Sequence, residues 1–230
     1  MKVESKLLLL VIVAVTILSS NFIVLAKPNE VKLTVIETRI DEKGGVIYTI
    51  PSTDNSGTNP DYALLGYHWY STANLYVNPA NNYGFSSSSV VNVITTSANT
   101  WDSQTNSQVF SYKGTTSRTA GKYDGYNVVA FGRYRNGVIG VTYLWSSGGH
   151  VVESDTLLNI RYSWSLTGAA GKMDVQNIIT HEFGHWCGLA DLYNSNDYWL
   201  TMYGYSNYGI TYQQTLGKGD ILGLQSIYGK

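Results

Sequence analysis

The feature that most limits how this chain can fold is a short run of residues, His181-Glu-Phe-Gly-His185. Two histidines spaced four residues apart lie on one face of a helix, close enough for both imidazole rings to bind one Zn²⁺ ion. The glutamate beside the first histidine, Glu182, can polarise a metal-bound water and accept its proton. The sequence therefore predicts a helix over residues 174–187 that carries two metal ligands and a general base.

The apolar residues of this helix support the prediction. At about 100° per residue they form one continuous arc, and both histidines lie outside it. The arc consists of Val175, Ile179, Phe183, Trp186 and Cys187. Asp174 is placed to cap the start of the helix. The alternative, in which the histidines are ordinary core or capping residues, is disfavoured because the helix buries one face and presents the histidine pair from another.

A catalytic zinc ion needs a third protein ligand and one open position. No histidine or glutamate follows residue 185, so the downstream candidates are Asp191, Asp197 and Asp220. Asp220 precedes a helix-like pattern and is more simply its N-cap, and Asp197 lies in a polar turn. Gly188 can end the active-site helix in a left-handed turn, which would bring the following residues back toward the metal. We therefore predict Asp191 as the third ligand.

Composition excludes several other classes of protein. Only 13% of the 230 residues are charged, the net charge is −1, and aromatic and β-forming residues supply the rest of the composition. Neither charge-driven disorder nor an electrostatic surface for nucleic acid fits these values. The single cysteine, Cys187, excludes an intrachain disulfide framework and a zinc site built from several thiolates. A metal ion must therefore be held by histidine and carboxylate side chains.

The first 26 residues differ from the rest. A lysine-containing start precedes an almost entirely apolar run at residues 7–18, and the segment ends on Ala26. This layout predicts a secretory signal peptide. The alternative is a retained membrane anchor, because residues 7–26 carry no charge over about the length of a membrane span. In both cases we expect the remainder of the chain to lie outside the cell.

The exported part divides into a short leader-like segment, residues 27–60, and a main domain, residues 61–230. The leader holds one predicted strand at residues 46–50 and ends in a turn-rich stretch. Strands and helices then follow in mixed order, which predicts an α+β or α/β domain. The strands are expected at residues 74–77, 108–112, 126–132, 138–145 and 151–159, and the helices at about 86–101, 174–187 and 220–228.

The zinc motif resembles a known family when its downstream residues are included. Gly188 and Asp191 follow the second histidine at fixed offsets, and Thr201-Met202-Tyr203-Gly204 follows further on. This pattern resembles the metzincin zinc proteases, most closely the matrixin-like secreted forms. Further similar stretches are Trp101-Asp102, YNVVAFG at residues 126–132, VESDTLLN at 152–159 and GDILGLQSIYG at 219–229.

The resemblance covers roughly residues 61–230 and implies an α+β fold. That fold has a twisted sheet, an active-site helix, a second long helix and a small C-terminal helical part. The implied activity is that of a secreted zinc endopeptidase. His181 and His185 match the first two metal ligands, Glu182 matches the general base, and Met202 matches the methionine of the turn beneath the metal.

Some positions depart from the family pattern. Asp191 stands where the third histidine is usual, a pattern also found in some bacterial secreted metzincins. No cysteine-switch leader is present, so whether residues 27–60 block the site is open. His68 and His150 are too few for the second, structural zinc ion of matrixins. Tyr203 and Tyr205 both follow Met202 closely, and no transition-state role can be assigned to either from the sequence.

By resemblance, the strand that precedes the one leading to the active-site helix is the edge strand that binds substrate. Here it is residues 140–145, with Val141, Thr142 and Tyr143 at its centre. An exposed edge can pair with the main chain of an extended peptide. The alternative is a central strand, paired on both sides, whose lack of charge reflects burial.

We therefore expect one catalytic zinc ion, peptide or protein substrates, no nucleic acid and a monomer. Membrane association is expected only if the N-terminal segment is not cleaved. Calcium stays an open alternative, with Asp155 and Asp197 as candidate carboxylates, although no known calcium-loop spacing occurs. Two other functions remain: a secreted binding module for carbohydrate or protein, given 6 Trp and 19 Tyr, and an inactive metal-binding relative.

Overall fold

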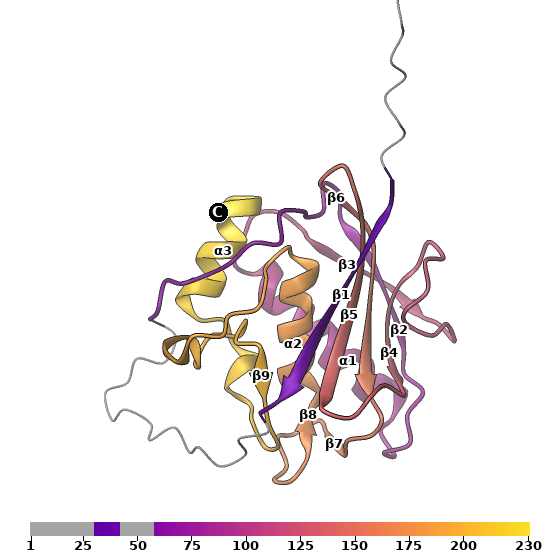
Figure 1. The fold of residues 1–230 in the computed structure, drawn as a ribbon. Helices are drawn as coiled ribbons and strands as arrows, with labels where there is room; N and C mark the ends of the chain where they lie inside the picture. Colours follow the sequence, from indigo (N-terminus) through magenta and orange to yellow (C-terminus); the bar gives the residue numbers. More distant parts are fainter. Residues whose placement is uncertain (1–29, 42–57) are drawn as a thin grey trace, which may run out of the picture.

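The computed structural model describes residues 30–41 and 58–230 (Figure 1). The predicted signal segment and the predicted strand at residues 46–50 lie outside these described ranges. Within them, one sheet has the strand order β3-β2-β4-β6-β5-β1-β9, and a two-stranded sheet pairs β7 with β8. The strands are β1 Lys32–Ile40, β2 Ala73–Asn78, β3 Phe110–Thr115, β4 Asn127–Gly132, β5 Val138–Ser147, β6 His150–Asn159, β7 Trp164–Ser165, β8 Met173–Asp174 and β9 Tyr205–Ser206.

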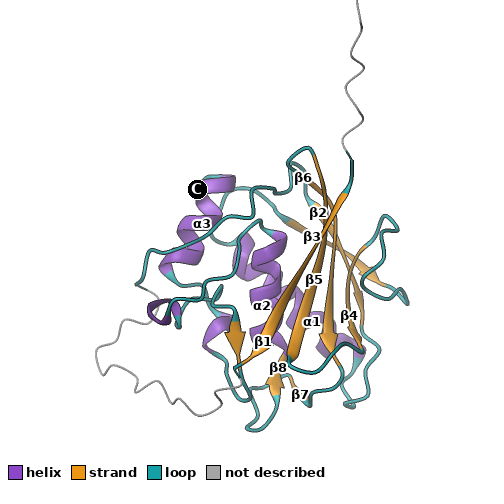
Figure 2. Cartoon of the chain, viewed as in Figure 1, coloured by secondary structure: helices purple, strands orange, loops and turns teal. Residues whose placement is uncertain are grey.

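Three α-helices complete the described fold, together with short 3-10 turns η1 (Ser195–Asp197) and η2 (Tyr212–Gln214). They are α1 Ser87–Asp102, α2 Val175–Trp186 and α3 Lys218–Tyr228. In the view of Figure 2, the strands gather on one side of the molecule and α3 lies on the other, with α2 between them. This is the α+β architecture implied by the resemblance. No helix within the described ranges is long and apolar enough to cross a membrane.

Helices α1 and α2 pack against each other, which positions α2, the helix that carries His181 and His185. Ser86 caps α1 by accepting a hydrogen bond from the Ser89 N–H at 3.1 Å. Trp101 near the end of α1 is fully buried, and its indole N–H donates to the Thr180 carbonyl of α2 at 2.8 Å. Because a buried indole N–H needs an acceptor, this bond fixes how α1 lies against α2.

Asp174 caps α2, as the sequence predicts, by accepting from the Asn177 N–H at 2.8 Å. The sequence predicts that only one face of this helix is buried, but the structure buries the other faces as well. Every residue of the helix from Ile178 to Trp186 is buried, including His181 and His185. The sheet, α1 and the C-terminal segment together surround the helix, so its polar residues face other parts of the protein instead of solvent.

The prediction that Asp220 is the N-cap of the last helix is wrong. Gly217 is the N-cap of α3, and Asp220 lies in the first turn, where its carboxylate accepts from the Gly217 N–H at 2.8 Å. The same carboxylate also accepts from the N–H groups of Thr201 and Met202, at 2.8 and 3.0 Å. The helix begins earlier in the chain than predicted, and the long-range hydrogen bonds of Asp220 tie the start of α3 to the turn at residues 201–204.

The prediction of an exposed edge at residues 140–145 also needs correction. Strand β5 pairs antiparallel with β6 on one side and antiparallel with β1 on the other. Strand β1 comes from the leader-like segment, and it reaches across the sheet from the upper right to the lower centre of Figure 1. The sequence alternative of a strand paired on both sides is therefore what the structure contains.

Candidate metal centre

The turn after α2 returns the chain to the helix. Gly188 has φ +97°, a left-handed conformation that L side chains rarely adopt. The Gly188 N–H donates to the His185 carbonyl and the Leu189 N–H to the Gly184 carbonyl, each at 3.0 Å. This bonding pattern is a Schellman motif, which ends a helix and reverses the chain. A Cβ at position 188 would also lie 2.8 Å from the Tyr67 carbonyl oxygen. Both the backbone conformation and this close contact therefore require glycine at this position.

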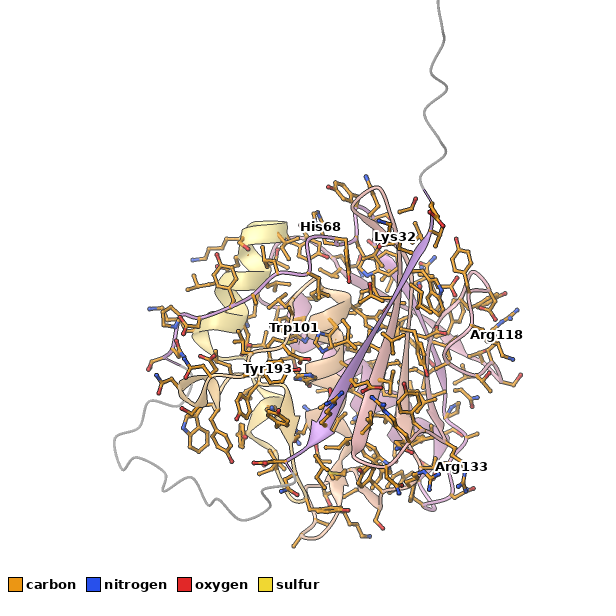
Figure 3. All side chains as sticks on the ribbon, in the orientation of Figure 1. Lys32, His68, Trp101, Arg118, Arg133 and Tyr193 are labelled. Carbon is orange, nitrogen blue, oxygen red and sulfur yellow. The ribbon has the colours of Figure 1, made fainter. Side chains whose placement is uncertain are left out.

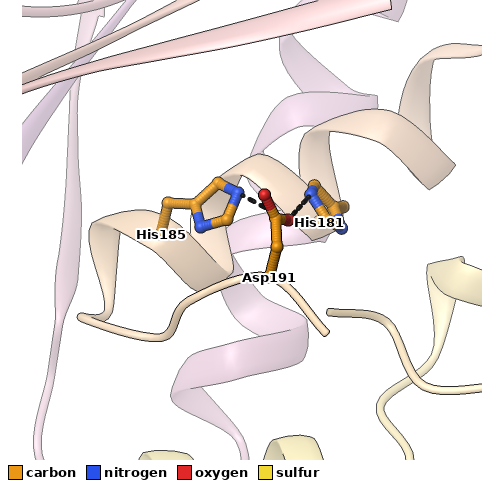
Figure 4. Close-up of side chains that lie close together, drawn as sticks. All are labelled: His181, His185 and Asp191. Atoms are coloured by element: carbon orange, nitrogen blue, oxygen red, sulfur yellow. Dashed lines mark ion pairs between the residues drawn. The ribbon is translucent and has the colours of Figure 1, made fainter. Parts of the chain in front are cut away.

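Asp191 reaches the two histidines after this turn (Figure 4). Its Oδ1 atom lies 3.2 Å from His181 Nε2 and 3.4 Å from His185 Nε2. All three atoms are buried, and none of them has a hydrogen-bond partner. Buried polar atoms are rarely left unpaired. Three of them facing one point therefore indicate a ligand that binds all three.

The spacing fits a zinc ion. With metal–ligand bonds of about 2.0–2.1 Å, two ligands of a tetrahedral ion lie about 3.3 Å apart. The two histidine–aspartate distances, 3.2 and 3.4 Å, bracket this value. Two imidazoles and one carboxylate are also a donor set that zinc accepts in catalytic sites. Among the described residues, no other group of three metal-binding side chains converges in this way.

The other nitrogen of each ring is held by a backbone carbonyl. The Nδ1–H of His181 donates to the Thr201 carbonyl at 2.7 Å, and that of His185 to the Leu189 carbonyl at 2.9 Å. Because a carbonyl oxygen can only accept, the proton of each neutral ring must sit on Nδ1. Each Nε2 therefore keeps a free lone pair directed at the position a metal ion would occupy.

Asp191 is oriented by Tyr193, a residue outside the sequence predictions. The Tyr193 hydroxyl donates to Asp191 Oδ2 at 3.0 Å, which leaves Oδ1 facing the histidines. Figure 3 labels Tyr193 on the loop beside α2. Burial and the neighbouring carboxylate raise the pKa of Tyr193, so this hydroxyl stays a proton donor. A tyrosine two residues from a ligand carries no local pattern that could have identified it.

His181 and Asp191 each shift the pKa of the other toward its charged form. Burial alone would lower the pKa of His181, but the adjacent Asp191 carboxylate outweighs it and raises that pKa to about 9. Burial would raise the pKa of Asp191, yet the two imidazoles hold it well below its usual range. Asp191 therefore stays ionised, and a metal ion that binds here must displace the proton held by His181.

Met202 packs against the helix that carries the two histidines. Its sulfur packs against Gly184, which stands between the two histidines, and a Cβ at that position would overlap the sulfur atom. Met202 is 1% exposed, and its N–H is held by Asp220. Gly184 is therefore the residue that allows the turn at residues 201–204 to approach the helix so closely.

Glu182 is fully buried and points toward the sheet. Its Oε2 accepts from the Thr142 hydroxyl of β5 at 2.6 Å, and its Oε1 accepts from the Thr38 hydroxyl of β1 at 2.7 Å. Burial raises the pKa of Glu182, although the two histidines and the two hydroxyls act in the opposite direction. Thr38 is not among the predicted site residues, because it is remote in sequence and lies in the leader-like segment.

The remaining predicted candidates lie elsewhere. Of the three edge-strand residues, only Thr142 contacts the site, whereas Val141 packs in a separate small cluster with Tyr143 beside it. Asp197 accepts from the Asn59 side-chain amide at 2.5 Å and is not part of the metal-binding group.

His68 and His150 also lie away from the metal-binding group, one on each side of Tyr70. The ring centroids of these histidines lie 4.5 and 3.8 Å from that of the tyrosine. Neither ring belongs to the group formed by His181, His185 and Asp191.

Comparison with known proteins agrees with this geometry. The family model of matrixin matches residues 69–229, which include α1, α2, α3 and the whole candidate metal centre. A search of curated proteins finds no match. The family match begins after β1, so that strand lies outside the matched region.

Proposed function

Because this chain belongs to the matrixin family of zinc metallopeptidases, we propose that it is an exported zinc endopeptidase with its active site on α2. The observation that carries the proposal is the convergence of three buried, unpartnered ligand atoms on one point. Their spacing of 3.2 and 3.4 Å suits one tetrahedral zinc ion.

Each side chain has a separate role in this proposal. His181 and His185 would hold the ion through Nε2, and Asp191 through Oδ1, with Tyr193 orienting the carboxylate. When bound, zinc polarises the scissile carbonyl and lowers the pKa of a neighbouring water molecule. Glu182 accepts the proton of the attacking water at its carboxylate and passes it to the leaving amine.

The chain is divided between export and catalysis. We propose that residues 1–26 direct export, that residues 27–60 are a leader and that residues 61–230 are the catalytic domain of a monomeric extracellular enzyme.

The proposal is tested on the purified chain from residue 27 onward. We expect one zinc ion per chain by elemental analysis and slow digestion of casein that a zinc chelator abolishes and added zinc restores. Glu182→Gln is the matched control, because it keeps the shape of the side chain and should retain zinc while losing digestion. A chain that binds no zinc, or that digests casein equally well with chelator present, would contradict the proposal.

A further inference from the structure

We infer that a one-way relay of buried hydrogen bonds positions the carboxylate of Glu182 for its role as general base. The relay runs from the indole N–H of Trp186 through the hydroxyl groups of Thr156 and Thr142, which makes these three side chains positioning residues. The inference rests on the proposed function, because it names what orients the general base of that same site.

The relay consists of three consecutive hydrogen bonds. The Trp186 indole N–H donates to Thr156 Oγ1 at 2.9 Å. Thr156 Oγ1 lies 3.0 Å from Thr142 Oγ1, and the Thr142 hydroxyl donates to Glu182 Oε2 at 2.6 Å. All four residues are fully buried, so bulk water does not compete for these bonds.

The two ends of the relay fix the direction of every proton in it. An indole N–H can only donate, and an ionised carboxylate can only accept. Thr142 uses its one hydroxyl proton on Glu182, so the proton between the two hydroxyl groups must belong to Thr156. Because the indole cannot accept a proton, the relay can hold the carboxylate but cannot carry a proton away from it.

Helix α2 supplies both ends of the relay, and the sheet supplies its middle. Glu182 and Trp186 are four residues apart, so they lie on one face of the helix with Cβ atoms about 5–6 Å apart. Thr142 and Thr156 are directly opposite each other in the pairing of β5 with β6, where Cβ atoms lie about 4.5–5.5 Å apart. Since α2 packs against both strands, these similar spacings let the helix and the sheet close the relay without a gap.

The donor end of the relay is fixed in the hydrophobic core. The Trp186 ring packs against Phe110 and Phe183, with ring centroids 6.0 and 5.2 Å away. A fixed donor at one end and a short bond at the other leave the carboxylate little freedom to rotate. A general base needs this precision, because a misplacement of about 1 Å can cost about 10²-fold in rate.

The two threonines are not explained by the packing of the strands. Valine has nearly the same shape as threonine and would fill a buried strand position without a polar atom to satisfy. A buried hydroxyl group costs free energy unless it is hydrogen-bonded. Here the bonds of both hydroxyl groups lead to the carboxylate of Glu182. The threonine pair therefore serves the carboxylate.

Gly140 leaves room for the carboxylate beside the relay. A Cβ at position 140 would overlap Oε1 of Glu182 and would lie 3.0 Å from the side chain of Ile178. The φ angle of Gly140 is outside the left-handed region, so the backbone conformation does not require glycine there. The space that Glu182 occupies is what excludes a larger residue.

The competing interpretation is that these bonds only fasten α2 to the sheet. A fastening role would lower stability, and the loss of another buried hydroxyl group from α2 should then have the same consequences. Thr180 provides this comparison, because it is also fully buried on α2. Its hydroxyl bonds to Ser97 and to the Gln176 carbonyl and makes no bond to Glu182. A positioning role lowers kcat instead, with KM and zinc content unchanged.

The test compares Thr142→Val with the matched control Thr180→Val in the chain from residue 27 onward. Both changes remove one buried hydroxyl group and keep the shape of the side chain. The unfolding free energy, the zinc content, and kcat and KM for casein digestion are measured for each protein. The proton resonance of the Trp186 indole N–H is recorded in the metal-free proteins and is assigned by its absence in Trp186→Phe.

We expect Thr142→Val to bind zinc as the wild type does but to lose about 10- to 100-fold in kcat, with KM unchanged. Thr142→Ser, which restores a hydroxyl group, should recover most of this loss. The Trp186 resonance should move in Thr142→Val, because hydrogen bonds in a chain polarise one another. Thr180→Val should keep the kcat and the resonance of the wild type. Gly140→Ala displaces the same carboxylate by another route and should also lower kcat.

Wild-type kcat in a folded, zinc-loaded Thr142→Val protein would overturn the inference. An equal loss of kcat in Thr180→Val, or unfolding of Thr142→Val alone, would also overturn it, since the bonds would then be structural. A Trp186 resonance that does not move in Thr142→Val would mean that the relay does not exist. Failure of the proposed function gives a different result, because the zinc-loaded wild type then digests no casein, and the resonance alone decides whether the relay exists.

Discussion

Asp191 and Asp155 are both buried carboxylates, but their oxygens have opposite surroundings. The oxygens of Asp155 on β6 accept hydrogen bonds from the N–H groups of Val128, Gly121 and Lys122, at 2.7, 2.7 and 3.2 Å. Asp191 Oδ1 has no hydrogen-bond partner and faces two imidazole nitrogens that have none either. A buried carboxylate whose oxygens all accept hydrogen bonds from backbone N–H groups holds those backbone segments in place, and we call such a residue a structural clamp. A buried acid with an unfilled oxygen beside other unfilled ligand atoms indicates a binding site.

The clamp extends to a neighbour of Asp155. Glu153 accepts from the N–H groups of Asp124 and Gly125, at 2.8 and 2.5 Å. Together the two acids hold the loop between β3 and β4 by its backbone. A calcium ion could bind Asp155 only after the three backbone N–H groups had moved away from the carboxylate oxygens, because the positive ends of these N–H groups repel a cation. Glu182 is an intermediate case, since its two carboxylate oxygens accept from the side-chain hydroxyl groups of Thr142 and Thr38.

The largest expected effect is at Asp191. Asp191→Ala removes one of three ligands, so zinc affinity should fall by more than the roughly 10- to 100-fold caused by losing an outer-shell partner. Caseinolysis should disappear with the metal, while circular dichroism of the metal-free protein stays close to that of the wild type. Equilibrium dialysis against zinc measures the affinity. Full zinc occupancy and activity in this variant would remove Asp191 from the ligand set.

The next effect concerns Glu182. Glu182→Gln keeps the hydrogen-bond acceptor but cannot take up a proton, so peptide hydrolysis should fall about 10²- to 10⁴-fold. Zinc content should be unchanged. If zinc disappears together with activity, Glu182 is a ligand or a structural residue, and the contrast with Asp191 is lost.

Tyr193 sharpens the comparison by testing the orientation of Asp191 alone. Tyr193→Phe removes the hydroxyl that donates to Asp191 Oδ2, so zinc affinity should fall about 10- to 100-fold. At saturating zinc, kcat should return to the wild-type value, because the hydroxyl acts only through Asp191. A loss of kcat that excess zinc does not repair would assign Tyr193 a direct role with the substrate.

Asp155→Asn tests the clamp. The amide group turns an acceptor into a donor and leaves at least one backbone N–H without a partner, which costs about 1–3 kcal/mol of unfolding free energy. Urea denaturation measures this loss. Zinc affinity should not change, since the clamp and the metal-binding group share no residue. Reduced zinc affinity in a folded variant would mean that the two regions are coupled.

The pH dependence of unfolding gives a second test of the clamp. Burial raises the pKa of Asp155 to about 7, although three backbone N–H groups act against it. The unfolded chain releases this proton near pH 4. Between about pH 4 and 7 the folded state therefore binds more protons, and the unfolding free energy should fall by at most about 1.4 kcal/mol per pH unit as pH rises.

Wild type and Asp155→Asn are compared by urea denaturation from pH 4 to pH 8, so that contributions from other groups cancel. The difference between them should change with pH up to about pH 7 and then become constant, because Asp155 is ionised in both states above that value. A difference that does not vary with pH would place the pKa of Asp155 near its ordinary value.

The sequence by itself determined the features that depend on local geometry. A helix with histidines at i and i+4, the cap at Asp174 and the reversal at Gly188 each involve only a few consecutive residues. Their stereochemistry therefore does not depend on the rest of the fold. The same local rules made Asp191 the strongest candidate for a third ligand, since the reversed chain has few other acids to present.

Only the tertiary structure decided which partners these residues meet. Thr38 and Glu182 are 144 positions apart, and no local pattern connects them. An uncharged, β-prone sequence such as that of β5 is the same for an edge strand and a paired one, because pairing depends on which distant segment lies beside it. Tyr193 and Asp220 likewise acquired their roles from hydrogen bonds that no sequence pattern marks. Local stereochemistry set the chemistry of the site, and non-local packing set its access and its support.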